Sequence, residues 1–136
     1  MIALFALLAA AAPAGNVLHV EVQGLRDSRG LLQGCLTANR KTFPDCRRDP
    51  HALKISVPAS AHQLVFTGFA PGDYAVTLFH DANANGKLDT LLGVPREGFG
   101  FSRNPVIRFG PPRYDNVNIR LGSGFSRISV RAQYIL

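Results

Sequence analysis

Apolar and polar side chains alternate along most of this chain, and that alternation limits the possible folds more than any other feature of the sequence. In "VLHVEV", Leu18, Val20 and Val22 fall on one side of the chain, and His19 and Glu21 fall on the other. A period of two is that of a β-strand with one buried and one solvated face, as in antiparallel sheets. After the first residues, no segment has a convincing helical period. The sequence therefore predicts an all-β protein.

About seven strands are predicted at short spacing, with turn residues between them. They cover residues 17–22, 31–38, 52–59, 62–69, 70–81, 115–122 and 126–136. The turn residues of "LRDSRG" predict that the first two strands pair as a hairpin. In the last strand, Ile128, Val130, Ala132 and Tyr134 are expected to point inward. This pattern is typical of an antiparallel, immunoglobulin-like β-sandwich, and a closed barrel is the alternative.

The start of the chain is apolar and ends in small residues. The run from Ile2 to Ala12, followed by Pro13 and Ala14, is typical of a secretory signal peptide cleaved after Ala14, although no basic residue precedes it. The run is shorter than the ~20 residues that span a bilayer, which disfavours a transmembrane anchor. We therefore expect residues 1–14 to be a signal peptide and residues 15–136 to form one domain. The protein would be periplasmic or secreted and would not span a membrane.

Cysteine content and charge narrow the class of protein further. The chain has two cysteines, Cys35 and Cys46, and an even count in an exported protein predicts one disulfide. The net charge is +6. Such a charge attracts anionic surfaces, but an ordinary soluble surface is the favoured interpretation. No base-reading motif is present, so no nucleic-acid partner is expected.

The longest gap between predicted strands runs from His80 to Asp115. This central loop is rich in apolar residues, so it is expected to pack rather than to be disordered, and function should be sought there. It opens with the pattern D-x-N-x-N-G-x-L-D, which matches the first part of a calcium-binding loop. The predicted Ca²⁺ ligands are Asp81, Asn83, Asn85, the backbone carbonyl of Lys87, and Asp89.

The calcium pattern is incomplete. An EF-hand has a bidentate glutamate at its twelfth position, where this chain has Leu92, so the loop is not an EF-hand. Glu97 is a candidate for the closing ligand. With only two certain carboxylates, the affinity for Ca²⁺ is expected to be weak, with a Kd of about 0.1–1 mM. The alternative is a turn rich in Asn and Asp that holds no ion, since these residues bond to nearby backbone.

Two residues of the central loop are candidates for catalysis, and four are candidates for ligand binding. His80, beside Asp81, and Glu97 are the residues that a general acid or base would require. A single histidine at a strand end is more often structural, and no G-x-S-x-G motif is present, so catalysis is the weaker interpretation. The predicted ligand-binding surface consists of Arg96, Glu97, Phe99 and Phe101.

The segment from Phe66 to Pro105 resembles the hallmark of a bacterial family known as domain of unknown function 2141. The motifs that carry the resemblance are the "PGDYA" turn, a strand ending in "HD", "NANGKLD" and "GVPREGFGFS". With the flanking strands, the resemblance spans nearly the whole of residues 15–136. It implies a small, exported, β-rich protein with no established activity. "PGDYAV" is also similar to prealbumin-like and carboxypeptidase-regulatory sandwich domains, which implies an accessory or binding module.

The sequence thus predicts an exported β-sandwich that binds a cell-envelope component through its central loop. The partner would be a glycan, a lipid headgroup or a protein, and Ca²⁺ is the one cofactor expected. A metal-assisted hydrolase that uses His80, Asp81 and Glu97 is one alternative. A structural envelope protein without a small ligand is the other.

Overall fold

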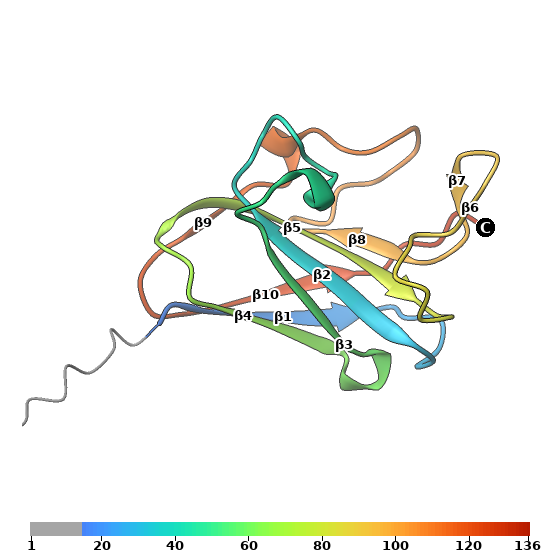
Figure 1. Ribbon diagram of the computed structural model, residues 1–136, viewed down its shortest axis with the longest axis horizontal. Coiled ribbons are helices and arrows are strands. Elements are labelled where there is room, and N and C mark those ends of the chain that lie inside the picture. The colour runs from blue at the N-terminus through green and yellow to red at the C-terminus, as the bar shows by residue number, and fades with distance from the viewer. Residues whose placement is uncertain (1–14) are drawn as a thin grey trace, which may run out of the picture.

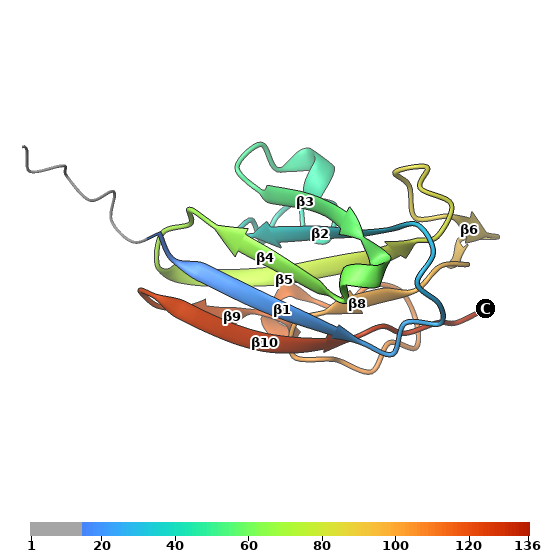
Figure 2. The same cartoon turned by 90° about the horizontal axis from the view of Figure 1, so that it is seen from below.

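Two β-sheets face each other in the computed structural model, which describes residues 15–136 (Figures 1 and 2). The first sheet has the order β10 (Phe125–Arg131), β1 (Val17–Gln23), β4 (Gln63–Thr67). The second has the order β3 (Leu53–Pro58), β2 (Leu31–Thr37), β5 (Gly72–Asp81), β8 (Phe99–Phe101), and β9 (Ile119–Leu121) pairs with the start of β5. A small hairpin of β6 (Thr90–Leu91) and β7 (Val94–Pro95) stands apart. The prediction of an all-β, sandwich-like fold is confirmed.

The core between the sheets follows from the alternation of the sequence. Leu18, Val20 and Val22 of β1 are buried, as predicted, and β4 and β10 add residues of the same kind. The second sheet contributes the inward side chains of β2 and β5. Gly34 of β2 faces Leu64 of β4 so closely that a Cβ at position 34 would lie 2.6 Å from the leucine. The burial of these inward side chains holds the two sheets together.

The pairing of the first strand differs from the prediction. β1 and β2 do not form a hairpin: β1 pairs with β4 and, in parallel, with β10, whereas β2 pairs with β3 and β5. The segment after β1 crosses from one sheet to the other, and Gly24 and Gly30, at φ of 76° and 66°, allow the sharp changes of direction. The turn residues of this segment thus serve a crossover rather than a hairpin.

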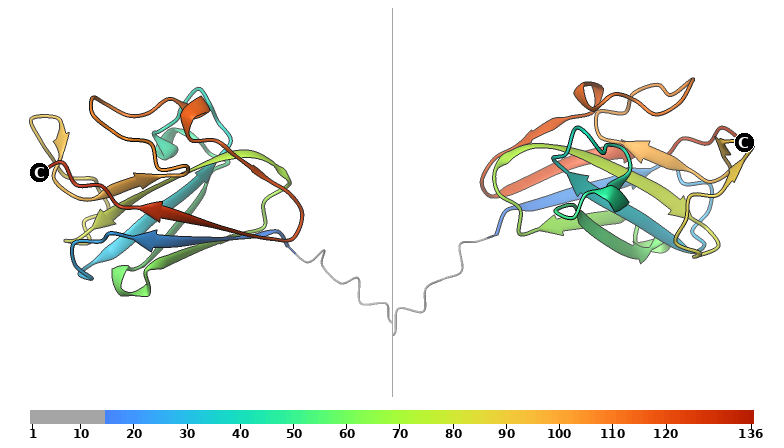
Figure 3. Two further views of the ribbon diagram at one scale, coloured as in Figure 1. Left: turned by 180° about the vertical axis from the view of Figure 1, so that it is seen from behind. Right: turned by 45° about the horizontal axis from the view of Figure 1, so that its top comes forward.

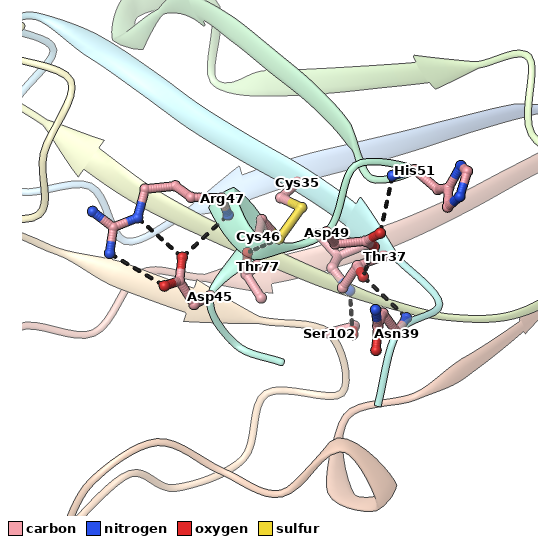
Figure 4. Close-up of a disulfide and its surroundings, with 11 residues drawn as sticks. Cys35, Thr37, Asn39, Asp45, Cys46, Arg47, Asp49, His51, Thr77 and Ser102 are labelled. Atoms are coloured by element: carbon pink, nitrogen blue, oxygen red, sulfur yellow. Dashed lines mark hydrogen bonds and ion pairs between the residues drawn. A yellow bond between two sulfur atoms is a disulfide. The ribbon is translucent and has the colours of Figure 1, made fainter. Parts of the chain in front are cut away.

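The loop from residue 38 to 52 is tied to the second sheet by a disulfide. Cys35 of β2 and Cys46 are bonded, with Cα atoms 6.6 Å apart (Figure 4). Beside the disulfide, the buried carboxylate of Asp49 accepts a hydrogen bond from the Thr37 hydroxyl (2.6 Å) and another from the His51 backbone N–H (3.0 Å). These bonds hold the loop over the outer face of the sheet.

The central loop contains short β-strands that the sequence did not predict. Its residues 99–101 form β8, which extends the second sheet beside β5, and residues 90–95 form the β6–β7 hairpin. β8 also contacts the first sheet, because Phe99 and Gln133 exchange two backbone hydrogen bonds. Within residues 15–136 no helix is long and apolar enough to cross a membrane. The predicted signal peptide, residues 1–14, lies outside the described residues.

Candidate functional site

The strand pair of β5 and β8 carries apolar side chains on both faces. In the register of this pair, Phe79 lies opposite Phe99 and Thr77 lies opposite Phe101. Because side chains alternate along a strand, these four residues share one face, which points away from the core between the sheets. Leu78, between them, lies in that core. The apolar side chains on the outer face of the pair must therefore be shielded from water by other parts of the chain.

Two loops supply part of this cover and form a second, smaller core. Phe43, from the disulfide-bonded loop, packs edge to face against Phe101 and Tyr114, with ring centroids 6.1 and 5.7 Å apart. Val117 is fully buried in the same cluster. Ser102, directly after β8, donates its hydroxyl to the Val117 carbonyl and accepts from a backbone N–H of β5. The cluster does not extend over the whole outer face: at Phe79 and Phe99 the face is only partly covered by it.

A cavity of about 570 Å³ lies at that end. Its floor is the outer face of β5 and β8, and its walls come from the β6–β7 hairpin with its flanks, the segment 107–111, Pro44 and Ile135. The lining is predominantly apolar, and Arg108 is its one charged residue. Cavities that hold small molecules measure roughly 300–1,000 Å³ and are mostly apolar with a few polar groups. The cavity has the size and lining of such a site.

The predicted calcium loop is closed by hydrogen bonds among its own groups. Asp81 is fully buried, and its carboxylate accepts from the backbone N–H groups of Asn85 (3.0 Å) and Gly86 (2.8 Å). Asn83 and Asn85 donate their side-chain amides to the Asp89 carboxylate, at 2.7 and 2.8 Å. These bonds, from Asn85 first and Asn83 second, lower the pKa of Asp89 below its ordinary value.

Glu97 bridges the two ends of this loop. One of its carboxylate oxygens accepts from the Ala82 N–H (2.8 Å), and the other accepts from the Asp89 N–H (2.9 Å). No cluster of three or more His, Cys, Asp or Glu suited to a metal is present within residues 15–136. The groups that would offer oxygens to a hard cation are those of the predicted set: the side chains of Asp81, Asn83, Asn85 and Asp89, and the backbone carbonyl of Lys87. An ion there would replace the amide bonds to Asp89, because both asparagines would have to turn their oxygens inward.

His80 lies at the end of β5 and is buried on the inner side of the sheet. Its Nε2 donates to the backbone carbonyl of Arg29 at 2.6 Å, since a carbonyl can only accept. Its Nδ1 is hydrogen-bonded to the Tyr134 hydroxyl, 3.1 Å away, and accepts from it when the ring is neutral. The same hydroxyl accepts from the Arg26 backbone N–H at 2.8 Å. His80 thus joins β5, the crossover after β1 and the C-terminal segment, and it is not among the residues that line the cavity.

The structure places the predicted site residues in two separate groups. Phe99 and Phe101 are buried and form part of the cavity floor. Arg96 is exposed, and neither it nor the buried Glu97 belongs to the lining. Sequence reasoning missed Phe79. The available signal was that this apolar residue lies on the face of its strand that was expected to be solvated. It also missed that Pro44 and segment 107–111 line the cavity, because no local sequence pattern predicts that contact.

The glycines of "EGFGFS" have a packing role that the sequence alone did not reveal. A Cβ at Gly98 would lie 2.5–2.8 Å from the Tyr134 ring, and a Cβ at Gly100 would lie 2.6 Å from Val130. Gly98 comes directly before β8, and Gly100 lies within it between Phe99 and Phe101. The alternation of glycine and phenylalanine therefore lets β8 approach β10 closely while it supplies the floor of the cavity.

Comparison with known proteins gives one match. The model of a family described as "Uncharacterized protein conserved in bacteria (DUF2141)" matches residues 20–129. That range includes every strand from β2 to β9, the calcium-like loop and the floor of the cavity. No curated protein and no solved structure matches the chain.

Proposed function

Since the chain belongs to the DUF2141 family, whose description names no activity, we propose a function from the geometry of the site. The protein is a binding module of the bacterial cell envelope that holds a small apolar ligand in the cavity over β5 and β8. The apolar residues 1–14, with the small residues that end them, support export.

The observation that carries this proposal is the outer face of the β5–β8 pair. Phe79 is only half-buried, and it lies beside Phe99 and Phe101 in an apolar cavity that protein atoms do not fill. Filling the cavity removes apolar surface from water, which stabilises a complex by roughly 25 cal/mol per Å² buried. A glycan would need several convergent polar groups, whereas the lining supplies few. An apolar molecule therefore fits this lining better than a glycan does.

The test is the binding of a neutral apolar fluorophore, N-phenyl-1-naphthylamine, to residues 15–136, which contain every strand of the fold. Val94→Trp places a large ring into the cavity wall. Val65→Trp is the matched control, because Val65 lies on the exposed side of β4 in the other sheet. We expect Val94→Trp to weaken binding at least tenfold and Val65→Trp to leave it unchanged, with both variants folded by circular dichroism. Equal binding by the two variants would refute the proposal.

We propose in addition that Ca²⁺ binds the loop of residues 81–89 weakly. Support comes from the sequence pattern and from the curled backbone, in which Asp81 already accepts from two successive N–H groups. At ten times Kd, a ligand of the native state adds about 1.4 kcal/mol to the free energy of unfolding, or roughly 3–6 °C in Tm for a domain of this size. Such a rise with millimolar Ca²⁺, abolished by Asp89→Ala, is the expected result. An unchanged Tm would leave the loop as a turn held by its own hydrogen bonds.

No observation favours the metal-assisted hydrolase. Both ring nitrogens of His80 and both carboxylate oxygens of Glu97 are engaged by other protein groups, and neither residue lines the cavity. The structural envelope protein has one observation in its favour, the closed hydrogen bonding of the loop at residues 81–97. That observation concerns the loop alone and does not explain the apolar cavity. The binding module explains it, so we prefer this proposal.

A further inference from the structure

Two loop tips beside the cavity carry apolar side chains that are almost fully exposed. Leu92, at the turn of the β6–β7 hairpin, is 97% exposed, and Phe109, in the loop after β8, is 96% exposed. Residues of both loops line the same cavity, so the tips flank one opening. The hairpin lies beside the C-terminus, and the loop after β8 bends toward the same end of the molecule (Figure 3). The two loops add the exposed apolar residues Leu91 and Val106, and the C-terminal segment adds Ile135 and Leu136.

Three exposed basic residues lie in these loops or next to them along the chain. Lys87 and Arg96 flank the hairpin, and Arg108 precedes Phe109; all three are exposed. None of them takes part in an ion pair within residues 15–136. Segments 87–96 and 106–109 contain one carboxylate side chain, that of Asp89, and it already accepts hydrogen bonds from the amides of two asparagines. The face formed by the hairpin and segment 106–109, which we call the tip face, is therefore apolar and positively charged.

We propose that the tip face docks onto an anionic lipid bilayer, with Leu92 and Phe109 inserted at the boundary between headgroups and acyl chains. Exposed apolar patches rimmed by polar residues mark protein or membrane interaction sites. Apolar insertion combined with basic residues is the arrangement by which proteins bind anionic bilayers without spanning them. The inference does not depend on a ligand in the cavity.

Charge decides between a bilayer and a second copy of the chain. A twofold dimer would use the same patch on both copies, so Lys87, Arg96 and Arg108 would face their equivalents. Like charges brought together oppose such a contact. An anionic bilayer instead complements all three basic residues at once and accepts the two separate apolar tips.

The experiment is flotation of residues 15–136 with vesicles of phosphatidylglycerol and phosphatidylcholine in equal parts, and with vesicles of phosphatidylcholine alone. Residues 1–14 are left out because an apolar segment would bind vesicles by itself. The variants are Leu92→Ser, Phe109→Ser and Arg108→Gln. Phe125→Ser is the matched control, because Phe125 is 61% exposed and is the first residue of β10. β10 begins at the end of the molecule opposite to the C-terminus (Figure 1).

The protein is expected to float with the anionic vesicles, and Phe125→Ser is expected to leave the partition coefficient unchanged. Phe109→Ser and Leu92→Ser each lower it about tenfold, which corresponds to the withdrawal of roughly two methylene groups from the bilayer. Arg108→Gln lowers it about fivefold, as one basic residue near an anionic surface does. Because all of these side chains are exposed, the variants are expected to keep the Tm of the parent protein.

Three results would overturn the inference: no flotation, flotation that is the same with phosphatidylcholine alone, or flotation that neither tip variant weakens. Sedimentation velocity without vesicles is the companion measurement. A dimer that Phe109→Ser dissociates would assign the tip face to a second copy of the chain instead. The binding of N-phenyl-1-naphthylamine is measured without vesicles, so failure of the docking inference and failure of the proposed function are distinguishable.

Discussion

Substitution of one glycine tests how β8 is fitted against the first sheet. In Gly98→Ala, the new Cβ would lie 2.5–2.8 Å from three atoms of Tyr134, closer than real Cβ contacts. The tyrosine cannot move freely, because its hydroxyl bonds to His80 and to the Arg26 N–H and its ring lies 4.2 Å under the Arg26 guanidinium. Overpacking of this kind costs about 1–3 kcal/mol. For a domain of this size, a cost near the middle of that range lowers Tm by roughly 4–9 °C.

The assay is thermal unfolding followed by circular dichroism, arranged as a double-mutant cycle. Gly122→Ala is the control, since nothing lies within 4 Å of a Cβ there and the backbone is not left-handed; we expect its Tm to stay within about 2 °C of the parent. Tyr134→Ala alone lowers Tm by the loss of its bonds, and adding Gly98→Ala to it is expected to cost almost nothing. If Gly98→Ala lowers Tm equally in both backgrounds, the clash with Tyr134 is not its cause and the reasoning is refuted.

Two further predictions concern the disulfide-bonded loop. Replacing Cys35 and Cys46 together by alanine is expected to lower the free energy of unfolding in urea by about 2–3 kcal/mol, the chain-entropy value for so short a closed loop, and dithiothreitol is expected to have no effect on this variant. Asp49 has a pKa below its ordinary value of 3.8, chiefly because the Thr37 hydroxyl donates to it. Its contribution to stability is therefore present above pH 3.8 and lost as the pH falls through the lowered folded-state value. Asp49→Asn is expected to lower the free energy of unfolding by about 1–2 kcal/mol at pH 7 and to remove this part of the acid dependence; an unchanged acid profile would contradict the assignment.

The strands were predictable because their alternation is a local property. Leu18, Val20, Val22 and Val130 face the core as the period of two requires. Which strand pairs with which is not a local property, and the parallel pairing of β1 with β10 has no signature in either segment. The turn residues after β1 were assigned to a hairpin because nothing in them distinguishes a hairpin from a crossover.

The site was predictable in location but not in form. The central loop was singled out for its length and apolar content, and it does form both the Asp/Asn loop and most of the cavity. β8 escaped prediction because "FGF" alternates apolar with glycine rather than with polar residues, so it lacks the pattern of a half-solvated strand. Metal binding at Asp81 and Asp89 stays a prediction, and so does any catalytic role of His80 or Glu97.

The parallel pairing of β1 with β10 has a consequence for how the protein is made. β1 lies in the middle of its sheet, and the Gly124 N–H bonds to the side chain of Asn16 across 108 positions of the chain. A ribosome therefore releases the first strand long before the partner that completes its sheet exists. The nascent chain cannot close this sheet until β10 has been synthesised, and closure then joins segments 108 positions apart, which slows folding. For a chain that crosses a membrane through a narrow channel before it folds, such a delay would be an advantage, because it keeps the polypeptide unfolded until β10 has been synthesised.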